Sequence, residues 1–128
     1  MDPVIHFEMP YEDRDRVAVF YESVFGWKTQ KFGEEMGNYL LVTTAETDAN
    51  PTAQRGAISG GFFPKGPNAP TQPSVVIGVA DIAASMRKVT EAGGQVLGEP
   101  VMIPGIGQFV HFLDTEGNRA SILQPSET

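Results

Sequence analysis

The strongest constraint on the fold is that one order of predicted elements occurs twice along the chain. Residues 1–63 are predicted to form a strand, a helix and three further strands, and residues 74–128 repeat that order. The spacing from the first strand to the glycine that ends the helix is the same in both copies. Residues 64–73, "PKGPNAPTQP", are predicted to form a linker because their prolines exclude a helix or a central strand. The chain is therefore predicted to be one domain made of two duplicated modules.

The first copy begins with alternating apolar residues that predict a strand at residues 4–9. This alternation places His6 and Glu8 together on the face opposite the apolar side chains. Asp13 is a predicted N-cap, and Gly26 is predicted to end the helix. The helix carries one predicted apolar stripe, formed by Val17, Phe20, Tyr21 and Val24. Further strands are predicted at residues 27–32, 39–44 and 57–63, with a polar loop at residues 45–56.

The second copy follows the same pattern after the linker. A strand is predicted at residues 74–79, and Asp81 is the predicted cap of a helix that ends at Gly93-Gly94. Three more strands are predicted, at residues 95–103, 108–113 and 119–124. The sequence "DTEGN" at residues 114–118 predicts a tight turn between the last two of them.

Composition excludes several classes of function. A formal net charge of −7 repels phosphate backbones, so we expect no nucleic-acid partner. No apolar run approaches the length of a membrane span, and the first ten residues lack the pattern of a secretory signal. The absence of cysteine removes disulfides and thiolate metal ligands, which is typical of a reducing compartment. We therefore expect no membrane partner and a cytoplasmic location.

Several motifs make the sequence similar to a known family. They are "HFE…FYESVFGW" in the first copy and "AGG…PGIGQF…DTEGNRASILQP" in the second. Together with the doubled strand–helix–three-strand order, they resemble the vicinal oxygen chelate superfamily. That superfamily contains glyoxalases, ring-cleaving dioxygenases and drug-resistance binding proteins. The resemblance implies an α+β fold of two βαβββ modules, with curved mixed sheets around a shared cavity and helices on the outside.

The resemblance also implies where a divalent metal ion would bind. Enzymes of the superfamily hold it with a side chain from the first and last strand of each module, usually His, Glu, His and Glu. His6 matches the first of these positions, whereas the second falls at Ser59 or the adjacent glycines. The two positions of the second module fall at Ser74 and Ser121. Serine hydroxyls are poor ligands for such an ion, so we expect no metal site and no cofactor.

Two alternatives remain open for the histidines. A set of His6, Glu8 and His111 could rebuild a two-histidine, one-carboxylate site if His111 also faced the cavity. The alternation of His111 with Val110 and Phe112 does not fix which face it occupies. His6 and Glu8 are otherwise either a candidate catalytic acid–base pair or ordinary polar residues of a solvated strand face.

The favoured interpretation is metal-independent binding of a small organic molecule in the cavity between the modules. Candidate ligand-binding residues are Ser59, Ser74, Ser121 and Tyr39. A homodimer is expected, because members of the superfamily often complete their cavities across a two-fold axis. The alternatives are a metal-dependent lyase or isomerase of the glyoxalase type, with His6 and Glu8 central, and a protein-interaction module with a vestigial cavity.

Overall fold

The computed structural model describes residues 1–45 and 56–126, which fall into two compact units. One unit comprises residues 6–73, here called the first module. The other comprises residues 74–128 together with residues 1–5, here called the second module. Most of the predicted loop at residues 45–56 lies outside the described residues.

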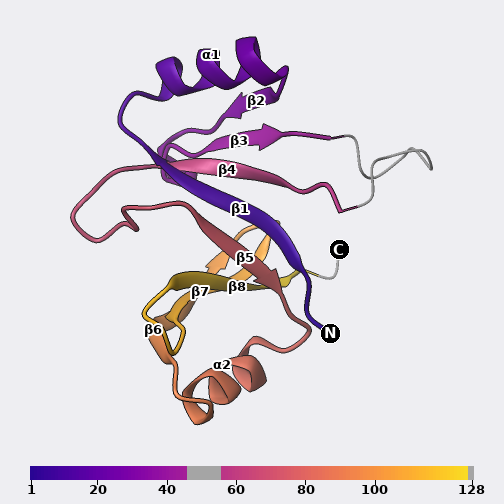
Figure 1. Ribbon diagram of the computed structural model, residues 1–128, viewed down its shortest axis with the longest axis vertical. Coiled ribbons are helices and arrows are strands. Elements are labelled where there is room, and N and C mark those ends of the chain that lie inside the picture. Colours follow the sequence, from indigo (N-terminus) through magenta and orange to yellow (C-terminus); the bar gives the residue numbers. More distant parts are fainter. Residues whose placement is uncertain (46–55, 127–128) are drawn as a thin grey trace. The chain divides into compact units, whose positions relative to one another are not determined.

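The first module has the order strand, helix and three strands (Figure 1). Its elements are β1 (Val4–Tyr11), α1 (Arg14–Phe25), β2 (Lys28–Lys31), a short 3-10 helix η1 (Glu34–Met36), β3 (Leu40–Thr43) and β4 (Ser59–Pro64). The strands lie in the order β2-β3-β4-β1, with β1 parallel to β4 and the other pairs antiparallel.

The second module repeats that arrangement. Its elements are β5 (Ser74–Gly78), α2 (Ile82–Glu91), β6 (Gln95–Ile103), β7 (Gly107–Leu113) and β8 (Arg119–Pro125). The strands lie in the order β5-β8-β7-β6, and only the β5–β8 pair is parallel. The predicted α+β class and the doubled βαβββ order are therefore confirmed.

The structure groups the first five residues with the second module. The sequence predicted a first module at residues 1–63. The amide of Gly78 in β5 donates a hydrogen bond to the carbonyl of Pro3 at 2.9 Å. The side chain of Ile5 also lies over Gly78, which has no side chain of its own to oppose it. A backbone hydrogen bond and an apolar contact thus attach this segment to β5.

Both helices begin where the sequence indicates. The carboxylate of Asp13 accepts a hydrogen bond from the amide of Arg16, and that of Asp81 accepts one from Ala84. Gly26 ends α1 in the left-handed conformation that glycine adopts without steric cost. None of the described helices is long and apolar enough to cross a membrane.

Each helix packs on one face of the strands of its own module and forms a separate core there. In the first module, Ala18 of α1 lies among buried side chains of the sheet: Tyr11, Leu40, Val42 and Phe62. In the second, Ile82 of α2 packs with Val79, Val110 and Ile122. Because strand side chains alternate, residues next to these core positions lie on the opposite face of each sheet.

The predicted apolar stripe of α1 is only partly correct. Val17 and Tyr21 pack against the core, but Phe20 and Val24 are 52% and 54% exposed. Ala18 is the buried residue of the helix, on the same side as Val17 and Tyr21. The exposed Phe20 and Val24 lie on the side of the helix away from Ala18.

Candidate functional site

A chain of two hydrogen bonds joins three side chains on the face of the first module opposite α1. His6 and Glu8 project from β1, and Tyr39 precedes β3. The Tyr39 hydroxyl lies 2.9 Å from Nε2 of His6 and 2.7 Å from Oε2 of Glu8. The structure therefore brings together three of the residues that the sequence singled out.

The protons in this chain have a definite order. The single hydroxyl hydrogen of Tyr39 is donated to Glu8, so the hydroxyl oxygen must accept from His6. His6 then carries a hydrogen on Nε2, and its Nδ1 is left as an acceptor. We call this arrangement the His6–Tyr39–Glu8 chain.

Burial shifts the ionisation of all three groups. It lowers the pKa of His6, which favours the neutral imidazole. Burial raises the pKa of Glu8, and the hydrogen bond from Tyr39 partly offsets this. The pKa of the Tyr39 hydroxyl is raised well above its ordinary value, first by burial and then by the adjacent Glu8 carboxylate. Tyr39 therefore stays protonated and serves as a hydrogen-bond donor.

Gly61 makes room for the aromatic ring in this chain. A Cβ atom at Gly61 would lie 2.1 Å from Cε2 of Tyr39, far inside contact distance. A Cβ at Gly60, on the other face of β4, would lie 2.6 Å from the Phe7 ring. Glycines inside a strand often mark such close approach, and here the approaching groups are the Tyr39 ring and both the ring and the carbonyl of Phe7.

Strand register shows which residue corresponds to each metal-ligand position of the superfamily. His6 and Ser74 each lie the same number of residues before an N-cap aspartate. In the second module Ser121 pairs with Val76, two residues after Ser74. The matching residue in the first module pairs with Glu8, two residues after His6, and that residue is Gly61.

Ser59 is therefore not the residue at the metal-ligand position, because it lies two residues before Gly61 on β4. It pairs with His6, and its hydroxyl oxygen accepts a hydrogen bond from the Thr44 amide at 3.2 Å. Its hydroxyl hydrogen remains available to a ligand on the same face as the His6–Tyr39–Glu8 chain.

The residues at the four positions do not fit a divalent metal ion. They are one imidazole, two serines and a glycine, and the Nε2 of that imidazole already carries a hydrogen and donates it to Tyr39. Across residues 1–45 and 56–126, no group of three or more His, Cys, Asp or Glu side chains could hold a metal ion. Of the alternative set, His6 and Glu8 lie on the first module and His111 lies on the second.

The second module has its own polar cluster on the face opposite α2. Ser121 is completely buried and pairs with His111, and its hydroxyl lies 2.7 Å from Nδ1 of that ring. His111 therefore lies on the face away from Val110, which settles the orientation that the sequence left open. Two more polar groups, Ser74 and Arg119, begin β5 and β8 on this same face.

Arg119 is the residue of this cluster that sequence reasoning missed. It directly follows the tight turn at residues 114–118 and precedes Ser121 by two positions, so both share a strand face. The signal that could have identified Arg119 is its place two residues before Ser121, a residue at a metal-ligand position, on the same strand.

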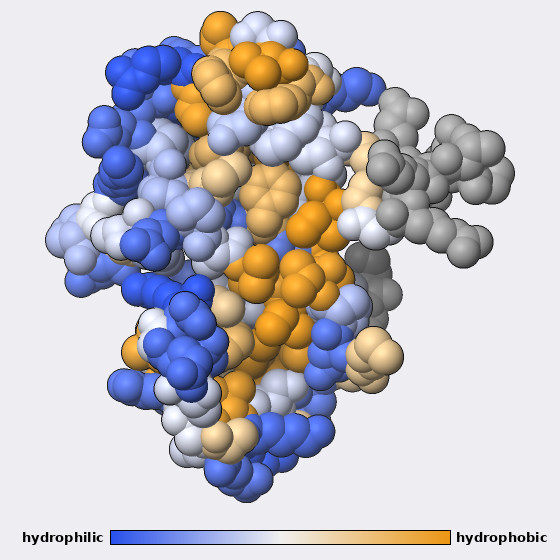
Figure 2. All heavy atoms as spheres, viewed as in Figure 1, coloured by the Kyte–Doolittle hydropathy of each residue, from blue (hydrophilic) through white to orange (hydrophobic). Residues whose placement is uncertain are grey.

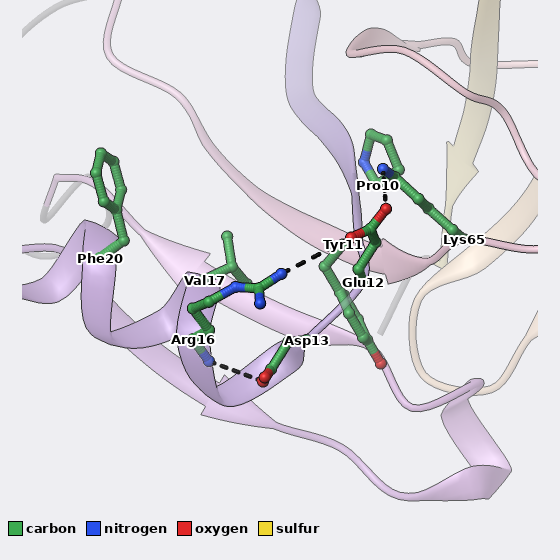
Figure 3. A pocket seen from close by; sticks show the side chains of 8 residues that line it. All are labelled: Pro10, Tyr11, Glu12, Asp13, Arg16, Val17, Phe20 and Lys65. Carbon is green, nitrogen blue, oxygen red and sulfur yellow. Dashed lines mark hydrogen bonds and ion pairs between the residues drawn. The ribbon is translucent and has the colours of Figure 1, made fainter.

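A separate hollow of about 350 Å³ lies on the first module, where β1 meets α1 (Figure 3). It is lined by Pro10, Tyr11, Glu12, Asp13, Arg16, Val17, Phe20 and Lys65. The Glu12 carboxylate pairs there with Lys65 at 3.0 Å and with Arg16 at 3.8 Å. These ion pairs are exposed to solvent, and none of the sequence-predicted site residues lines the hollow.

His111 is expected to make the protein less stable in acid. Burial, together with the positive charge of Arg119, lowers its pKa to about 4. Between pH 6.5 and 4 the unfolded state therefore binds more protons, and the free energy of unfolding falls as pH falls. In the wild type we expect His111 to lower the free energy of unfolding by about 2 kcal/mol across this range, and His111→Asn should abolish that decrease. Denaturant unfolding of both proteins at pH 7 and pH 4.5 measures it, and equal slopes with pH would contradict the assignment.

Comparison with known families agrees with the geometry of both modules. A family model described as the Glyoxalase/Bleomycin resistance protein/Dioxygenase superfamily matches residues 4–122. The chain belongs to this superfamily. The resemblance proposed from the sequence is confirmed, and the matched range includes every site residue discussed above.

Curated relatives carry names from the same superfamily. The chain is 29% identical over 120 residues to "Putative glyoxylase CFP32" of Mycobacterium tuberculosis, covering 93% of this chain and 42% of that protein. It therefore spans about two fifths of the length of that relative. It is 33% identical over 119 residues to a "Glyoxylase-like domain-containing protein" of Didymella fabae, covering 90% of this chain and 88% of that one.

Solved structures of other proteins share the fold of this chain. Hypothetical protein BH1468 from Bacillus halodurans matches with a TM-score of 0.70 and 16% identity, covering 99% of this chain and 96% of that one. Methylmalonyl-CoA epimerase from Mycobacterium tuberculosis matches with a TM-score of 0.68 and 14% identity, covering 96% and 87%. Identities this low establish the common fold and carry no information about the reaction.

Proposed function

We propose that this superfamily member binds a small organic molecule without a resident metal ion. The observation that carries the proposal is the His6–Tyr39–Glu8 chain. Tyr39 makes a hydrogen bond with Nε2 of His6, and its ring lies against Gly61. His6 and Gly61 are the two positions of the first module that correspond to metal ligands in the superfamily. The superfamily's chemistry of metal-stabilised oxyanions therefore lacks its ligands here, while a preorganised polar surface remains.

The polar atoms left free on this surface favour a ligand with hydrogen-bond donors. His6 presents Nδ1 as an acceptor, and the described residues give the second carboxylate oxygen of Glu8 no hydrogen bond. Ser59 adds a hydroxyl on the same face. An amine or hydroxyl group would match these acceptors, and the acidic net charge of the protein further favours a cationic ligand.

Metal analysis and a thermal-shift panel test this proposal together. We expect no stoichiometric nickel, zinc, manganese or iron after purification in metal-containing buffer, and no thermal shift with any of these ions. At least one amine-bearing or aromatic compound should raise the unfolding temperature, because a ligand that binds only the folded state stabilises it. A panel with no active compound would contradict the proposal.

Tyr39→Phe should weaken both the fold and ligand binding. The change removes the hydroxyl that joins His6 to Glu8 and leaves two half-buried polar groups without a partner. We expect the free energy of unfolding to fall by about 1–3 kcal/mol. Denaturant unfolding measures this loss, and titration with the compound found in the panel measures the change in affinity.

Tyr21→Phe is the matched control for this change. The Tyr21 ring stacks on Trp27, and no described residue makes a hydrogen bond to its hydroxyl. Its loss should change stability by less than about 0.5 kcal/mol. Equal losses in the two variants would show that the His6–Tyr39–Glu8 chain contributes nothing specific.

A glyoxalase-type lyase or isomerase is the second candidate, favoured by the names of the curated relatives. In that function His6 would ligate a metal ion, and Glu8 would act as the base. It requires Tyr39 to release His6, so it predicts stoichiometric metal that is lost in His6→Ala. Finding such metal would favour this candidate over metal-independent binding.

A protein-interaction module is the third candidate, and the surface of α1 favours it. Four large apolar residues of this helix are exposed: Val19, Phe20, Val24 and Phe25. Figure 2 shows apolar side chains gathered at the top of the view, where Figure 1 places α1.

A homodimer in a reducing cytoplasm remains part of our proposal, and light scattering would give the mass of the assembly.

A further inference from the structure

Among the described residues of the second module, two hydrogen-bond donors are buried without a partner. They are the Ser74 hydroxyl and the Nε–H group of Arg119. A buried donor that is left unsatisfied costs free energy, and nearly all such groups in folded proteins find an acceptor. Two of them in one module therefore indicate that an acceptor from outside the chain belongs there.

Strand register places the two donors next to each other. Val76 of β5 pairs with Ser121 of β8 in parallel register. Ser74 and Arg119 each lie two residues before this pair, so they occupy the same level on adjacent strands. Residues two apart in a strand share a face, so Ser74, Arg119 and Ser121 lie on the same side of the sheet.

The charge of Arg119 decides what kind of acceptor fits. A water molecule could accept from the serine, but it would leave the half-buried guanidinium without a counter-charge. The chain holds 16 acidic residues against nine Lys and Arg, yet in the part that the structure describes no carboxylate forms an ion pair with Arg119. Neighbouring His111 is held neutral, so it adds no competing positive charge and needs no anion itself.

We propose that the second module binds an oxyanion, a carboxylate or phosphate group of a small molecule, at Ser74 and Arg119. The Nε–H of Arg119 and the Ser74 hydroxyl each donate to an oxygen of the anion, and the guanidinium supplies the charge. In this proposal Arg119 supplies the positive charge of the site, beside Ser74 and Ser121.

The proposal is independent of the one made for the first module. The residues that carry it lie on β5 and β8, whereas the His6–Tyr39–Glu8 chain lies on the first module. Anion binding can therefore be present without amine binding, and the reverse, so the two experiments fail separately.

Titration of the full chain with inorganic phosphate and with acetate tests the site, using sodium chloride at matched ionic strength as the reference. The ¹⁵N–¹H resonance of the Arg119 Nε–H group should shift and saturate with phosphate or acetate but not with chloride. Calorimetry should give the same dissociation constant. Saturation with phosphate alone or with acetate alone distinguishes the two sources of the oxyanion. A resonance that moves with neither up to tens of millimolar would overturn the proposal.

Two variants separate binding from a structural role. Arg119→Lys keeps the charge but removes the forked donor, and it should weaken binding at least about tenfold. Ser74→Ala should also weaken binding, yet without anion it should raise the unfolding temperature by roughly 2–5 °C, since it removes an unsatisfied donor.

Arg87→Lys is the matched control, because Arg87 lies exposed on α2 of the same module. It should bind phosphate and acetate as the wild type does. Wild-type affinity in both Arg119→Lys and Ser74→Ala would place any anion elsewhere and overturn the proposal. If either variant fails to fold, the Arg119 resonance of the wild type remains the deciding measurement.

Discussion

Replacing Gly61 by alanine is expected to lower the free energy of unfolding by about 3 kcal/mol or more. The added methyl group would meet the Tyr39 ring at 2.1 Å, and that ring is held by hydrogen bonds to His6 and Glu8. Either the strands separate or Tyr39 leaves its place and the chain breaks. Denaturant unfolding gives the loss, and ligand titration shows whether the binding surface survives.

The cause can be separated from a general effect of substituting glycine. Gly66 has open space around it and an ordinary backbone conformation, so Gly66→Ala should cost less than about 0.5 kcal/mol. Gly61→Ala made in a Tyr39→Ala background should lose most of its effect, because the clashing ring is gone. If the cost of Gly61→Ala is the same in both backgrounds, Tyr39 is not what the glycine accommodates.

The second large effect is expected at the adjacent residue, whose side chain points the other way. Phe62 is 2% exposed and packs in the core between the sheet and α1, against the ring of Tyr21 among others. Phe62→Ala should lower the free energy of unfolding by about 3–5 kcal/mol, because it removes buried apolar surface and leaves a cavity. Chemical denaturation monitored by Trp27 fluorescence measures it.

Phe25→Ala provides the comparison within the same module. Phe25 is 61% exposed at the end of α1, although its ring contacts those of Tyr21 and Trp27. Its loss should cost less than about 1 kcal/mol. If Phe25→Ala and Phe62→Ala lowered the free energy of unfolding by similar amounts, the face of β4 that carries Phe62 would not be the core face.

The parts of this structure that sequence predicts well are those set by local chemistry. Asp13 and Asp81 start helices because a short carboxylate can accept from a free backbone amide, and that signal needs no tertiary information. Alternation of side chains along β1 places His6 and Glu8 on one face, and this signal is also local. The doubled element order then follows from reading these signals twice.

What sequence could not provide depends on contacts between distant segments. Phe20 and Val24 fit an apolar stripe, but the side of α1 that packs on the sheet is the side that carries Ala18. Tyr39 was only a candidate for contact with a ligand. Its role as the bridge between two β1 side chains depends on the pairing of three strands around Gly61. Arg119 became visible only when burial showed that its Nε–H group has no partner.

The attachment of residues 1–5 to β5 bears on how the protein is synthesised. Pro3 leaves the ribosome well before Gly78, the residue whose amide it accepts, and all of the first module emerges between them. The N-terminal segment must therefore wait, unpaired, until translation has passed β5. Closing so long a loop is slow, so we expect this hydrogen bond to form late in folding.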